Sequence, residues 1–66
     1  MRALTPTYVT RLNGRMEAVV YDTERQARVA TCHHQHRTSL AAMSCAIRMA
    51  RRELARRRRL EREERS

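Results

Sequence analysis

Hydrophobic and polar residues alternate on both sides of Asn13-Gly14 in "TYVTRLNGRMEAVVYD", residues 7–22. Alternation with a period of two predicts two strands, and Asn-Gly between them predicts a two-residue hairpin turn because both residues tolerate positive φ. That turn would place Val9 opposite Ala18 and set the faces of the sheet.

A third strand is predicted in "QARVATCHH", residues 26–34, after a turn at residues 22–25. Continuing the same pairing sets Val29 opposite Ala18 and gives the sheet, about residues 7–34, one small apolar face. The opposite face would carry two tyrosines and two arginines: Tyr8, Tyr21, Arg15 and Arg28.

The apolar spacing changes to steps of three and four after Arg37, which predicts a helix over about residues 39–62 with Thr38 or Ser39 as its N-cap. The expected sheet-facing stripe is Leu40, Met43, Ile47, Ala50 and Leu54. The predicted fold is α+β: a three-stranded antiparallel sheet packed on one long C-terminal helix, in a single domain spanning residues 1–66. A helix of that length spans about 36 Å, whereas a seven-residue strand spans about 23 Å, so its C-terminal part should overhang the sheet.

Charge is concentrated in that overhanging part. The chain has a net charge of +8, and residues 48–59 hold seven arginines and one glutamate, a net charge of +6. These arginines are Arg48, Arg51, Arg52, Arg56, Arg57, Arg58 and Arg59. Such a field favours nucleic acid or an acidic protein as partner, although Glu61, Glu63 and Glu64 could offset part of it on a merely solvated face.

The outer sheet face is a second candidate surface. Tyr8, Tyr21, Arg15 and Arg28 could stack on bases or enter a groove. Exposed tyrosines also occur in dimer contacts, and an edge strand at residues 7–12 or 26–32 could pair with its copy in a homodimer.

Cysteine and histidine gather in "TCHHQHR", residues 31–37. On a strand, Cys32, His34 and His36 point the same way, and with Cys45 they would be enough for a zinc site. The spacing C-x-H-x-H is not that of a recognised zinc finger, so we expect no metal and no cofactor, with zinc as the less favoured alternative. Any role of His33 beside them is open.

Catalysis and membrane insertion are not expected. Phe and Trp are absent, which disfavours a deep pocket, and no glycine-rich phosphate loop occurs. Residues 1–9 lack the apolar run of a signal peptide, and no segment approaches the roughly 20 apolar residues that span a bilayer. We therefore expect a cytoplasmic, non-enzymatic protein with free thiols and no membrane span.

The order of strand, Asn13-Gly14 turn, strand, turn, strand and "RTSLAAMSCAIRMA" resembles the arm-binding domains of tyrosine integrases and the related AP2-type DNA-binding domains over about residues 7–54. In those families the sheet lies in the major groove, so the resemblance implies DNA contacts by Arg15, Arg28 and Tyr8. In size and simplicity the chain also looks like accessory proteins of phages and plasmids, including anti-CRISPR inhibitors.

The leading hypothesis is a small nucleic-acid-binding protein of a phage, plasmid or bacterium, with the arginine-rich helix contacting phosphates. The alternative is an inhibitor that binds a host defence complex through its basic helix or a sheet edge. The sequence leaves open whether the partner is DNA, RNA or protein.

Overall fold

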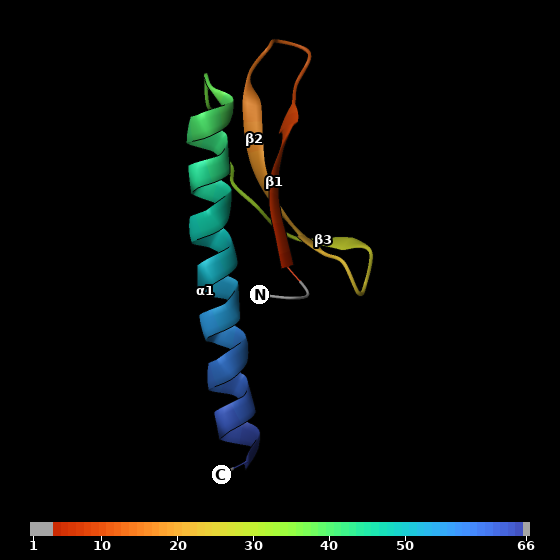
Figure 1. Ribbon diagram of the computed structural model, residues 1–66, viewed down its shortest axis with the longest axis vertical. Helices are drawn as coiled ribbons and strands as arrows, with labels where there is room; N and C mark the ends of the chain where they lie inside the picture. The colour runs from red at the N-terminus through yellow and green to blue at the C-terminus, as the bar shows by residue number, and fades with distance from the viewer. Residues whose placement is uncertain (1–3, 66) are drawn as a thin grey trace.

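A computed structural model describes residues 4–65, with side chains through residue 64. Three strands, β1 (Leu4–Thr10), β2 (Met16–Asp22) and β3 (Ala27–Thr31), form an antiparallel sheet in the order β1-β2-β3. One helix, α1 (Ser39–Arg65), packs against a single face of this sheet (Figure 1). The predicted α+β fold is confirmed.

The loop between β1 and β2 differs from the predicted two-residue turn. The Gly14 N–H donates to the Arg11 carbonyl at 2.9 Å, and the Arg11 N–H donates to the Arg15 carbonyl at 2.7 Å. Within this loop, Gly14 alone has a positive φ, 82°. This is a three-residue loop that ends in a left-handed glycine. The extra loop residue shifts the register by one, so that Tyr8, instead of Val9, pairs with Ala18.

The connection between β2 and β3 also shifts the predicted pairing. Oδ1 of Asp22 accepts hydrogen bonds from the N–H groups of Glu24 (3.0 Å) and Arg25 (3.1 Å), which makes a turn of four residues, 23–26. An irregularity in β3 follows, and Ala30 pairs with Val20, so the expected pairing of Val29 with Ala18 is wrong. A bulge adds a residue to one strand only, which sequence alternation does not reveal.

The helix begins as predicted. Oγ1 of Thr38 accepts a hydrogen bond from the Ala41 N–H at 3.1 Å, which is the geometry of an N-cap. The predicted apolar stripe is only partly correct: Ala50 and Leu54 pack against the sheet as expected, but Leu40 is 78% exposed, and three alanines spaced four apart are fully buried. These are Ala42, Ala46 and Ala50. Small side chains let the helix backbone approach the sheet closely, and the larger Met43 and Ile47 lie at the margins, half-buried.

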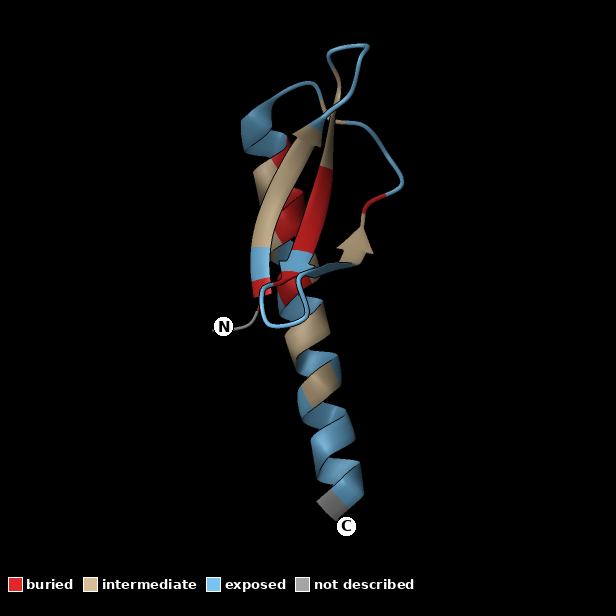
Figure 2. Ribbon diagram, turned by 90° about the vertical axis from the view of Figure 1, so that its right-hand side faces the viewer, coloured by how far each residue is buried: buried red, intermediate tan, exposed pale blue. Residues whose placement is uncertain are grey.

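The core is thin and occupies only the upper part of the molecule. Val19 and Val20 are its largest fully buried side chains, and the rest consists mainly of alanines, Leu4 and two cysteines. The lower part of α1 extends beyond the sheet, and side chains 58–64 are all exposed (Figure 2). This overhang begins later than predicted, because Ala50 is buried against the sheet and Arg57 reaches Asp22, so most of the arginine run lies beside the sheet. The helix thus lengthens the molecule to 48 Å against a width of 19 Å.

Candidate functional site

Six arginines lie on the side of α1 opposite its buried alanines, and two of them, Arg48 and Arg52, border a hollow beside the end of β3. At 3.6 residues per turn the six fall within about a third of the helix circumference. We call this set the arginine stripe: Arg48, Arg51, Arg52, Arg58, Arg59 and Arg62. All six are exposed, and from first to last the stripe covers about 21 Å of helix.

Two of the predicted binding residues face the protein's own carboxylates instead. Arg56 forms a two-pronged contact with Glu53, from Nε to Oε1 at 3.0 Å and from Nη2 to Oε2 at 2.6 Å. Arg57 bonds Glu53 through Nε at 3.0 Å and the buried Asp22 through Nη2 at 3.1 Å. The Asp22 contact joins residues 35 positions apart and ties the helix to the end of β2.

These contacts hold both carboxylates in the charged form. Hydrogen bonds from Arg56 and then Arg57 lower the pKa of Glu53 against the opposing effect of burial. The pKa of Asp22 is lowered mainly by the Arg25 N–H, with Arg57 and the Glu24 N–H adding to it, again against burial. The charges of Arg56 and Arg57 are therefore compensated inside the protein.

Within the stripe, four arginines form no ion pair with any carboxylate that the structure describes. They are Arg51, Arg52, Arg58 and Arg59. All four are exposed to solvent, and Arg52 also borders hollows that it shares with Ala30 and Thr31 of β3.

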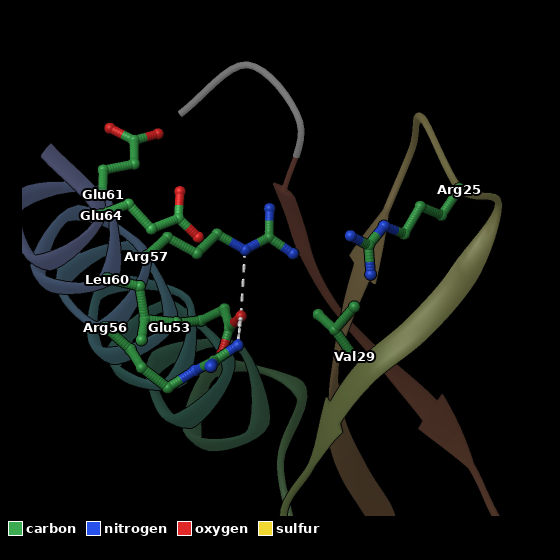
Figure 3. A pocket seen from close by; sticks show the side chains of 8 residues that line it. All are labelled: Arg25, Val29, Glu53, Arg56, Arg57, Leu60, Glu61 and Glu64. Carbon is green, nitrogen blue, oxygen red and sulfur yellow. Dashed lines mark hydrogen bonds and ion pairs between the residues drawn. The ribbon is translucent and has the colours of Figure 1, made fainter.

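A hollow of about 450 Å³ lies between the lower half of α1 and the β2–β3 turn (Figure 3). Its charged lining is balanced between three arginines and three glutamates: Arg25, Arg56, Arg57, Glu53, Glu61 and Glu64. Because the signs cancel and Arg56 and Arg57 are engaged with Glu53, this hollow is a poorer anion site than the arginine stripe.

The outer sheet face retains only part of its predicted set. Tyr8 pairs with Ala18, which packs against α1, so Tyr8 shares the helix-facing side of the sheet and its expected place on the outer face is wrong. Tyr21 is 37% exposed and pairs with Arg28 on the outer face. Arg15 lies at the end of the β1–β2 loop, beyond the strands.

A second group of chemically capable side chains surrounds the β3–α1 connection. We call it the Cys/His cluster: Cys32, His34, His36 and Cys45. One ligand atom from each lies within 4.8 Å of all the others. The Cys32 Sγ is 3.7 Å from the His36 Nε2, and the Cys45 Sγ is 3.7 Å from the His34 Nε2. Both cysteines are buried and free.

Backbone contacts position the Cys/His cluster. The Cys32 N–H donates to the Ala18 carbonyl at 3.0 Å, while Met16 and His36 exchange two backbone hydrogen bonds at 2.9 and 2.7 Å. Burial and then the neighbouring Cys32 raise the pKa of Cys45, and Arg48 beside it acts in the opposite direction. The sequence predicts three of these residues on one strand, which is wrong, because β3 ends at Thr31 and the loop after it brings them together.

No family model, curated protein or solved structure matches the chain. Among residues 4–65, the structure has no helix with the length and apolar character needed to cross a membrane.

Proposed function

We propose that this protein binds nucleic acid through the arginine stripe of α1. The observation that carries the proposal is the division of the arginines between two faces. Arg56 and Arg57 neutralise internal carboxylates, whereas Arg51, Arg52, Arg58 and Arg59 do not. Guanidinium groups suit phosphate because their planar fork matches two phosphate oxygens.

The shape of the molecule supports the same proposal. An α-helix with its side chains is about 10–12 Å across, close to the width of about 12 Å of the DNA major groove. The sheet lies behind the stripe, so it leaves this approach open, and the projecting end of α1 adds reach (Figure 2). Tyr21 and Arg28 lie on the opposite side of the sheet and would contribute only to a second contact.

The sheet edges give less support to the alternative, an inhibitor that extends a partner's sheet. Pro6 in edge strand β1 has no N–H to donate, and β3 is short and irregular. Both features discourage pairing with another strand, whether of a partner or of a second copy. A defence-complex inhibitor would therefore have to use the arginine stripe against an acidic protein surface.

A salt titration tests the proposal. Anisotropy of a fluorescent DNA duplex and of an RNA hairpin should show binding at low salt. Four phosphate contacts predict a fall in duplex affinity of roughly 100-fold between 50 and 200 mM salt. Absence of binding to both probes at 50 mM, or an affinity that does not change with salt, would contradict it. Pull-down from nuclease-treated lysate that retains an acidic protein would favour the inhibitor instead.

A further inference from the structure

We propose that the Cys/His cluster binds one Zn²⁺ ion as a structural site that clamps the β3–α1 connection onto the fold. This inference does not depend on the nucleic-acid proposal, because the proposed ligands are different side chains, although Arg48 and Arg52 of the arginine stripe lie beside the cluster. It rests on the donor set, the distances among the donors and the composition of the core.

The donor atoms already lie close to a tetrahedron. Zinc bonds of about 2.3 Å to sulfur and about 2.0 Å to nitrogen give donor-to-donor edges of about 3.3–3.8 Å in tetrahedral geometry. The two sulfur-to-nitrogen distances of 3.7 Å, Cys32 to His36 and Cys45 to His34, agree with such edges. Even the widest separation, 4.8 Å, needs a contraction of only about 1 Å.

The fold holds these four ligands in position in the absence of metal. Pairing with Ala18 fixes the backbone of Cys32, pairing with Met16 fixes His36, and the second turn of α1 supplies Cys45. The Cys32 Sγ is held in place by two further contacts, since it accepts a hydrogen bond from the Ala18 N–H and donates one to the His34 carbonyl, both at 3.2 Å. Two thiolates would balance the charge of one Zn²⁺.

Two sulfur and two imidazole donors form a soft, closed set that selects zinc and leaves no open position. A zinc site with no open position stabilises structure and does not catalyse. Such a site would help this protein, because its core contains few large side chains. Among the side chains that the structure describes, the fully buried ones larger than alanine are Val19 and Val20. Domains this small commonly depend on a metal or disulfides for stability.

A disulfide between Cys32 and Cys45 is the competing use of the same atoms. Both thiols are free, and a disulfide would need neither histidine. In the structure the two thiols neighbour each other, but each sulfur also has an imidazole nitrogen beside it, from His36 and His34 respectively. This arrangement favours the metal.

The test uses the full chain, stripped of metal and kept reduced, with Co²⁺ as a spectroscopic probe and Zn²⁺ as competitor. We expect one Co²⁺ per chain, with the intense visible bands of tetrahedral cobalt, and its displacement by Zn²⁺. Native mass spectrometry should find one zinc per chain. At free zinc 100-fold above Kd, the Tm should rise by roughly 10 °C or more.

Adjacent histidines provide the matched control. His34→Asn removes a ligand that is exposed, so the fold should tolerate it, and zinc affinity should fall by at least roughly 100-fold. His33→Asn changes an exposed neighbour outside the cluster and should leave zinc affinity unchanged. Cys45→Ser gives an independent second loss of a ligand.

Several results would overturn the zinc site. These are equal zinc affinity in wild type, His34→Asn and Cys45→Ser, octahedral cobalt spectra, or a Tm that zinc does not change. Formation of a Cys32–Cys45 disulfide at the same rate with and without zinc would assign the cysteines to redox chemistry instead.

Discussion

The two halves of α1 have the same backbone structure but opposite surroundings. Residues 39–54 bury three alanines against the sheet, whereas residues 58–64 are exposed on every side. In the first half, small side chains permit close packing. In the second, arginine, glutamate and leucine are strong helix formers and continue the helix where no core supports it. The comparison shows how the N-terminal half of one helix can contribute to the core while its C-terminal half projects into solvent as a charged surface.

The largest expected difference between the halves is in tolerance to a larger side chain. Ala46→Leu should lower the free energy of unfolding by about 2–3 kcal/mol, because Ala46 is fully buried against the sheet. Ala55→Leu, at an exposed position between the two halves, just after the last hydrophobic residue that packs on the sheet, should change it by less than about 0.5 kcal/mol. Urea unfolding of both variants checks this, and equal losses would mean that the halves are not packed differently.

A smaller difference in the free energy of unfolding is expected between substitutions of two neighbouring arginines. Arg57→Gln removes contacts with Asp22 and Glu53 and should cost roughly 1 kcal/mol, since the guanidinium is partly exposed. Arg58→Gln removes a solvent-directed charge and should be near neutral. If Arg58→Gln destabilises the protein as much as Arg57→Gln, the two faces are not distinct.

The loss in free energy of unfolding caused by Arg57→Gln should depend on pH. Asp22 and Glu53 have pKa values below their ordinary 3.8 and 4.5, so their stabilising contribution is complete above about pH 4.5 and is lost as the pH falls through the folded-state values. The wild type and Arg57→Gln should therefore differ at pH 7 and converge under acid conditions. A difference that stays constant down to pH 3 would contradict the assigned ion pairs.

The sequence was sufficient for the element order, the N-cap at Thr38 and the presence of an overhang, because these depend on local periodicity and on lengths. The sequence was insufficient to predict which residues pair between neighbouring strands. Asn13-Gly14 is compatible with a two-residue or a three-residue loop, and the single-residue difference moves Tyr8 to the helix-facing side. The error in the predicted helix stripe has a similar cause: close packing selected alanines over the larger Leu40.

The candidate sites were predictable to different degrees. Helical periodicity alone groups the arginines by face, but nothing local reveals that Arg57 reaches Asp22, 35 residues earlier. The Cys/His cluster was recognisable as a set of ligand types, while its convergence depends on the loop after β3 and on pairing of His36 with Met16. Both failures concern contacts between distant parts of the chain.

The most direct test of the nucleic-acid proposal compares two double variants that remove equal charge from adjacent positions. Arg58→Gln with Arg59→Gln takes two arginines from the stripe, whereas Arg56→Gln with Arg57→Gln takes two that bond internal carboxylates. In salt titrations with a DNA duplex, the first variant should bind about 10-fold more weakly at low salt, and the magnitude of its log–log slope should fall by about 2. The second should retain nearly the wild-type slope. Equal losses in both variants would show that only net charge matters and would contradict a binding surface on the outer face of α1.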